Sequence, residues 1–86
     1  MKINSFSTDA KLNDYMRTRM RAIGVTQADM AKACGKTQAY ISKHLDGQTS
    51  WRLDDIESLA GLFGFAEGVT FIDTATNYVP RNSRLN

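Results

Sequence analysis

The sequence predicts one compact all-α domain of four to five short helices. Apolar residues recur every three or four positions along most of the first 63 residues, which is the period of an amphipathic helix. Glycine follows most of these stretches, as it does at the ends of helices. The chain has 86 residues and one cysteine, so it has room for a single core and forms no internal disulfide.

The first predicted helix covers residues 9–23. Ser7 or Thr8 is expected to cap its start, and Gly24 to end it. Its apolar residues form one stripe: Leu12, Met16, Met20 and Ile23. The preceding residues 1–8 are predicted to be a short N-terminal arm.

The second predicted helix covers residues 27–34. Thr26 is the expected N-cap, and Asp29 three residues later completes a weak form of the capping box. Cys34 is interpreted as a small core residue, because no second cysteine and no nearby histidine could make it a nucleophile or a metal ligand.

Two further helices are predicted over residues 38–45 and 53–63. Thr37 is the expected N-cap of the former, whereas Asp54 and Asp55 suit the positive end of the dipole of the latter. The apolar positions expected to face the core are Ile41, Leu45, Leu53, Ile56, Leu59, Ala60 and Phe63.

Residues 66–86 are predicted to be an extended or short β segment with a frayed tail after Pro80. The β-forming run Val69–Ile72 favours a short strand. A hairpin, an extended arm and a strand that pairs with a partner chain remain open alternatives. A set of apolar side chains exceeds what a tail needs and points to a dimer interface: Phe63, Phe65, Val69, Phe71 and Tyr78.

Charge is unevenly distributed along the chain, although its formal net value is only +2. Residues 11–52 contain eight Lys and Arg against three Asp, whereas residues 53–80 contain five acidic residues and no basic one. A polyanion is therefore expected to prefer one end of the molecule, although a solvated basic face is the simpler alternative.

The helices at 27–34 and 38–45 are joined by a tight turn at Gly35. Ala31 is small, which lets the second of the two helices cross closely over the first. This arrangement leaves polar or small side chains on the outer face of the second helix: Gln38, Ala39, Ser42 and Lys43. Such side chains can approach the base edges of DNA without steric conflict.

Over residues 11–65 the chain resembles the helix-turn-helix repressors of the lambdoid phage repressor and Cro type, the Xre family. The resemblance rests on the stretches TQADMAKACG, ISKHLDG and WRLDDIESLAGLFGF. A narrower likeness to small regulators of actinobacteria and their phages rests on residues 51–54. The sequence departs from the family pattern at Lys36 and His44, where apolar residues are usual. Residues 9–65 are therefore expected to form the DNA-binding domain.

The resemblance implies that the helix at 38–45 lies in the major groove and reads bases. Gln38 is the leading candidate, since a Gln can bond adenine N6 and N7 as a pair, although helix capping or solvation is its simpler role. Thr37 and Ala39 offer methyl groups to thymine. Ser42 and Lys43 reach bases or phosphates, and Lys43 is assigned to guanine.

A second set of residues is expected to position the protein on DNA phosphates: Gln27, Lys36, Tyr40, Gln48, Thr49, Arg52 and one arginine of the first helix. Arg19 is selected from the three arginines of that helix, the others being Arg17 and Arg21. For Tyr40, packing is an equally open interpretation. Trp51 is expected to pack the loop against the last helix, and His44 to be buried.

The sequence predicts neither catalysis nor a cofactor. One His and one Cys cannot build a zinc site, and no phosphate-binding glycine motif occurs. We therefore expect a regulator, most readily a repressor, that binds double-stranded DNA as a homodimer, at least on DNA, in the cytoplasm of a bacterial host cell. No membrane segment is expected. An antitoxin-like protein-interaction module and a phage recombination-control protein are the alternatives.

Overall fold

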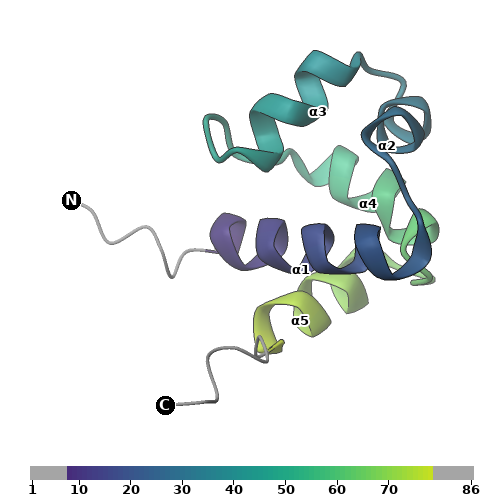
Figure 1. Cartoon of the computed structure of the whole chain (residues 1–86). Coiled ribbons are helices and arrows are strands. Elements are labelled where there is room, and N and C mark those ends of the chain that lie inside the picture. The colour runs from purple at the N-terminus through teal and green to yellow at the C-terminus, as the bar shows by residue number, and fades with distance from the viewer. Residues whose placement is uncertain (1–7, 79–86) are drawn as a thin grey trace.

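Five helices make up the described part of the chain, residues 8–78, in the computed structural model (Figure 1). They are α1 (Thr8–Ile23), α2 (Gln27–Cys34), α3 (Gln38–Leu45), α4 (Leu53–Leu62) and α5 (Gly68–Asn77). Residues 8–78 contain no strand, so the predicted all-α class is confirmed. The expected arm at 1–8 and the tail after Pro80 lie almost wholly outside the described residues.

The bounds of α2 follow from local chemistry at both ends. The Thr26 hydroxyl oxygen accepts from the Asp29 backbone N–H at 3.1 Å, and the Asp29 carboxylate accepts from the Thr26 N–H at 2.9 Å. The Thr26 backbone N–H, and next the Thr26 side chain, lower the pKa of the Asp29 carboxyl below its usual value. Gly35 then ends the helix with φ +67°, a left-handed conformation that only glycine adopts without strain.

A single core joins all five helices. Its fully buried large side chains are Met16, Met30, Ile41, Leu59 and Phe71. Figure 1 shows α2 and α3 on one side of the molecule and α5 on the opposite side, with α1 and α4 between them. The arrangement therefore separates the exposed face of α3 from α5.

The C-terminal segment differs from the expectation, because residues 68–77 form a helix and not a β or extended segment. Val69–Ile72 has strand propensity, but Gly68, Phe71 and Ala75 recur at helical spacing and all three are buried. Packing of this face against α1 and α4 outweighs the weak local preference for a strand. The Gly68 N–H donates to Glu57 Oε1 at 3.2 Å, which ties the start of α5 to α4.

The aromatic residues assigned to a dimer interface mostly belong to the core instead. Phe63 and Phe71 are 3% and 0% exposed, and their ring centroids lie 5.5 Å apart. Tyr15 of α1 contacts Phe71 and Tyr78, with centroid separations of 6.2 and 5.3 Å. These aromatic side chains pack against one another within the chain, where the sequence predicted packing against a partner chain. They complete the hydrophobic core.

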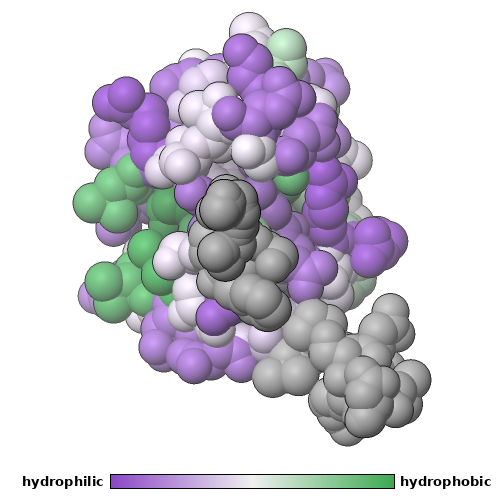
Figure 2. Space-filling view, turned by 90° about the vertical axis from the view of Figure 1, so that its left-hand side faces the viewer, coloured by the Kyte–Doolittle hydropathy of each residue, from purple (hydrophilic) through white to green (hydrophobic). Residues whose placement is uncertain are grey.

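Large apolar side chains are exposed at three described positions: Ile23, Leu53 and Val69. Leu53 was expected in the core, but it is 66% exposed at the start of α4; Val69 is 70% exposed at the start of α5. Figure 2 shows hydrophobic residues gathered at one edge of a face that is otherwise mostly hydrophilic. Within residues 8–78, no helix combines the length and hydropathy of a membrane span.

Candidate nucleic-acid interface

The outward face of α3 carries the residues proposed to read bases. Gln38, Ala39 and Lys43 are exposed, whereas Ser42 is half-buried. Thr37 is exposed as well, but its hydroxyl oxygen accepts from the Tyr40 backbone N–H at 3.1 Å and caps α3. The Thr37 hydroxyl oxygen is therefore engaged in the cap of α3. The inner face of α3 is buried through Ile41 and Leu45.

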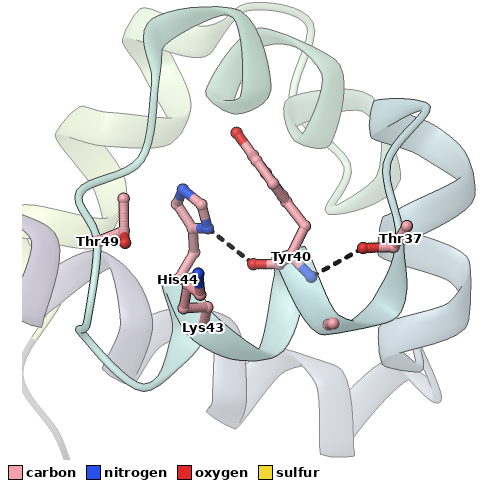
Figure 3. Close-up of a pocket in the computed structure, with 6 residues that line it drawn as sticks. Thr37, Tyr40, Lys43, His44 and Thr49 are labelled. Atoms are coloured by element: carbon pink, nitrogen blue, oxygen red, sulfur yellow. Dashed lines mark hydrogen bonds between the residues drawn. The ribbon is translucent and has the colours of Figure 1, made fainter.

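A pocket of about 380 Å³ lies beside this face. Its lining comes from α3 and from the loop that follows it: Thr37, Ala39, Tyr40, Lys43, His44 and Thr49. Figure 3 shows the Tyr40 and His44 side chains extending from α3 into the space enclosed by α3, the loop and α4. Ala39 and Lys43 line the pocket and are exposed, so this hollow borders the proposed base-reading surface.

The residues assigned to phosphates in the following loop are all exposed. Gln48 and Thr49 lie in the loop, and Arg52 precedes α4 as its N-cap without a side-chain hydrogen bond to the helix. Gln27 is half-buried at the first position of α2, where unpaired backbone N–H groups favour an anion. In the sequence, Gln27 precedes α3, and Gln48, Thr49 and Arg52 follow it.

Tyr40 takes the packing role that was left open for it. Its hydroxyl donates to Asp55 Oδ2 at 2.5 Å, so this hydroxyl has a hydrogen-bond partner inside the protein. This bond raises the pKa of Tyr40 to about 12, because ionisation would place two negative oxygens in contact. Asp55 is 2% exposed, although its position in a helix first turn suggested only a favourable charge at the helix dipole.

Lys36 is also drawn towards this buried carboxylate. Its ammonium lies 3.9 Å from Asp55 Oδ1 and 4.8 Å from the centroid of the Tyr40 ring. The negative charge of the buried Asp55 carboxylate attracts the Lys36 ammonium. Lys36 therefore has a partner within the protein, whereas the sequence predicted only a contact with a DNA phosphate.

The structure argues against Arg19 as the arginine of α1 that meets DNA. Arg19 is half-buried and lies four residues after Tyr15, on the side of α1 that packs against α5. Its Nε is buried without a hydrogen-bond partner. Arg17, in contrast, lies beside the end of α3 and pairs with Asp46 at 2.9 Å. Arg21 is exposed on the same face as Arg17.

A network of hydrogen bonds that was not predicted from the sequence links the end of α3 to α1. Asn13 Nδ2 donates to His44 O at 3.0 Å, and Trp51 Nε1 donates to Asn13 Oδ1 at 2.6 Å. The Trp51 backbone N–H donates to Asp9 at 3.0 Å. Trp51 thus contacts both α1 and α3. Local sequence patterns could not reveal this pairing, because Asn13 and Trp51 are 38 positions apart in the sequence.

Two other groups have structural roles. His44 is 3% exposed, as expected, and its ring stacks on Tyr40 with a centroid separation of 4.1 Å. Cys34 is half-buried; burial, and next the negative charge of Asp55, raise the pKa of its thiol to about 11. Such a thiol is a poor nucleophile at neutral pH. Within residues 8–78, no three potential metal-binding side chains come together.

Comparison with known families agrees with this geometry. Residues 12–70 match the family model described as helix-turn-helix domain, and this span contains α2, the turn at Gly35 and α3. The chain belongs to the helix-turn-helix domain family. Neither a curated protein nor a solved structure gives a significant match to the chain.

As a helix-turn-helix protein, the chain is a DNA-binding protein of a family that is typically not enzymatic. In helix-turn-helix proteins the second helix of the motif enters the major groove and presents its N-terminal residues to the bases. In this protein that helix is α3, which we call the recognition helix from here on. Its exposed N-terminal residues are Gln38 and Ala39.

Proposed function

We propose that this helix-turn-helix protein is a sequence-specific transcriptional regulator that binds double-stranded DNA and represses promoters by covering them. The observation that supports this best is the exposed face of the recognition helix. Gln38, Ala39 and Lys43 point to solvent, while Ile41 and Leu45 hold the opposite side in the core. The resemblance to the Xre family, including phage repressors and Cro, supports the same function, and we assign its action to the bacterial cytoplasm.

Base readout is assigned to the N-terminal half of the recognition helix. Gln38 bonds adenine N6 and N7, and the methyl groups of Thr37 and Ala39 contact thymine. Lys43, one turn further along, donates to guanine, with Ser42 beside it. The capping bond of Thr37 supports this assignment, because it orients the first turn that carries Gln38.

Phosphate contacts are assigned to the two ends of the motif. Gln27 meets one strand at the start of α2, and the exposed loop residues Gln48, Thr49 and Arg52 meet the other end of the half-site. Arg17 or Arg21 replaces Arg19 in this role, since both lie on the face of α1 nearer α3. These contacts hold the protein on DNA but carry no sequence information.

Dimerisation on DNA is assigned to the solvent face of α4 and α5. Leu53 at the start of α4 and Val69 at the start of α5 expose their apolar side chains, and α5 lies on the side of the molecule opposite the recognition helix (Figure 1). A two-fold dimer places two recognition helices about 34 Å apart, one turn of DNA. The expected operator is therefore an inverted repeat.

Enrichment of random duplex DNA, read by sequencing at near-physiological salt, tests this function. We expect an inverted repeat whose half-sites are one helical turn apart. Salt-sensitive binding without any enriched sequence would contradict the regulator and would favour a protein-interaction role. Offset direct repeats would instead favour a recombination-control protein.

A further inference from the structure

The recognition helix and α4 are separated by a gap that side chains fill. No Cα atom of α3 lies within 8 Å of a Cα atom of α4, whereas α3 approaches both α2 and α1 within that distance. Tyr40 and His44 of α3 also line the pocket of about 380 Å³, together with Thr49 of the following loop. Besides the packing of α3 on α2 and α1, the side chains that cross the gap therefore contribute to the spacing of α3 and α4.

Tyr40 is the side chain that spans it. Figure 3 shows its ring rising from α3 with the hydroxyl directed towards α4. That hydroxyl donates to Asp55 Oδ2 at 2.5 Å, and Asp55 sits in the first turn of α4 with 2% exposure. A hydrogen bond to a buried carboxylate is stronger than one between neutral groups.

The Tyr40 ring is itself held in place. The His44 ring stacks on it with a centroid separation of 4.1 Å, and His44 Nδ1–H donates to the Tyr40 carbonyl at 2.7 Å. The Lys36 ammonium lies over the ring at 4.8 Å and also faces Asp55. His44 in turn contacts Trp51, with centroids 4.9 Å apart. Tyr40 has little freedom to change its direction.

Tyr40 lies on the side of the recognition helix away from Gln38. Two residues along a helix correspond to a rotation of about 200°. A shift of the helix at Tyr40 therefore moves Gln38 by a similar distance relative to the DNA. Paired hydrogen bonds to one base tolerate only a few tenths of an ångström of such movement.

We propose that Tyr40 and Asp55 are positioning residues for base recognition, because their hydrogen bond sets the spacing and rotation of the recognition helix relative to α4. This inference rests on the proposed function, since it assigns how the base-reading face is held. Neither residue touches DNA. Their effect is on which sequence is preferred more than on how tightly any DNA is bound.

The test compares Tyr40→Phe with a matched control. Tyr40→Phe removes the hydroxyl and retains the ring against His44 and Lys36. Tyr15→Phe removes a hydroxyl from the other side of the core, where Tyr15 packs against Phe71. Each variant is measured on the duplex enriched by the wild-type chain, on its single-base variants and on an unrelated duplex, at a temperature where thermal melts show full folding.

We expect Tyr40→Phe to lower the ratio of specific to non-specific affinity about tenfold, the size expected for one lost bond to a charged group. Affinity for the unrelated duplex should stay within twofold of wild type. Tyr15→Phe should leave both quantities unchanged. A purely stabilising role of the hydroxyl would leave the ratio unchanged for folded protein.

Two substitutions at Asp55 supply an independent comparison. Asp55→Asn keeps an oxygen that accepts from Tyr40, whereas Asp55→Ala does not, and both remove the charge that faces Lys36. We expect Asp55→Asn to retain the base preferences and Asp55→Ala to lose them. If Asp55→Ala does not fold, Tyr40→Phe and Asp55→Asn decide the matter, since both nearly preserve side-chain volume.

Two results would overturn the inference in distinguishable ways. Unchanged base preferences in folded Tyr40→Phe, with a sequence-specific wild-type chain, would remove the positioning role and leave the proposed function intact. A wild-type chain without sequence preference on any duplex would overturn both, because no base readout would exist for these residues to position.

Discussion

Neighbouring residues of the recognition helix have opposite roles, and the sequence separates them only in part. Helical spacing predicts that Gln38 and Lys43 are exposed and that Ile41 is buried, and the structure has them so. Helical spacing did not decide the role of Tyr40, because an aromatic side chain with a polar hydroxyl can contact either a phosphate or a buried partner. The partner, Asp55, lies 15 residues away in the sequence, and no local pattern connects the two.

Replacement of Gln38 by Ala tests base reading at a single residue. Loss of a bidentate contact should cost about 1–3 kcal/mol of discrimination and relax specificity at one base pair per half-site. Gln48→Ala is a matched control in the loop, and it should weaken binding to all duplexes alike. Competition binding against single-base operator variants measures both. Equal effects on every sequence for Gln38→Ala would contradict its assignment.

Cys34 should behave as a buried thiol. Because its pKa is raised to about 11, the thiolate fraction at pH 8 is roughly a hundredfold below that of a free cysteine. Alkylation of the folded protein should be slower by that factor and should accelerate about tenfold per pH unit up to pH 11. Urea-unfolded chain provides the reference rate. A fast reaction at pH 8 in the folded state would disprove the burial.

At the scale of elements, the helix-turn-helix was predictable because its boundaries are encoded locally. Thr26 with Asp29, Gly35 and Thr37 supply the caps and the turn, and each acts within a few residues. The helix α5 was not predictable in the same way, because Val69, Thr70 and Phe71 favour a strand in isolation. Its helical form depends on burial of Phe71 against α1 and α4, which are distant in the sequence.

Gly35→Ala should destabilise the turn between α2 and α3. An added Cβ would meet no atom within 4 Å, so the cost comes only from the positive φ of 67° and should be about 1–2 kcal/mol. Gly61→Ala is the control, since Gly61 lies within α4 and also has open space. That substitution should stabilise the protein by up to about 1 kcal/mol. Urea denaturation of both variants measures the difference; a loss at both glycines would contradict the explanation.

Phe71 should be essential to the fold. Phe71→Ala removes a side chain with 0% exposure and should cost about 3–5 kcal/mol, much of the stability of a domain this size. Val69→Ala, two residues away and 70% exposed, should change stability by less than about 0.5 kcal/mol. Thermal unfolding followed by circular dichroism compares them. Native-like stability of Phe71→Ala would mean that α5 is not part of the core.

At the scale of the whole molecule, the uneven distribution of charge along the sequence agrees with the arrangement of the helices. The basic residues precede Leu53 in the sequence for the most part, and α2 and α3 lie together on one side of the molecule (Figure 1). The acidic residues of α4 and α5 lie on helices that the proposed DNA contact does not use. This polarity favours approach of a polyanion from the side of the recognition helix.

Salt dependence measures the extent of this contact. About five phosphate contacts predict a slope of about −4.5 in a plot of log affinity against log salt. Arg52→Ala should reduce the magnitude of the slope by about 0.9, whereas Arg19→Ala should leave it unchanged. Fluorescence anisotropy between 50 and 200 mM salt is suitable, because a slope of this size changes affinity by about 500-fold across that range. A reduced slope for Arg19→Ala alone would reverse the assignment of the two arginines.

The most direct measurement is a nuclear magnetic resonance titration of the backbone amides with duplex DNA. If the recognition helix reads DNA, the largest shifts should fall on residues 37–43, with smaller ones at Gln27 and in the loop at 48–52. The amides of α5 should shift little at the first half-site. Shifts concentrated around Leu53 and Val69, with α3 unaffected, would contradict the account and identify that apolar surface as the binding site.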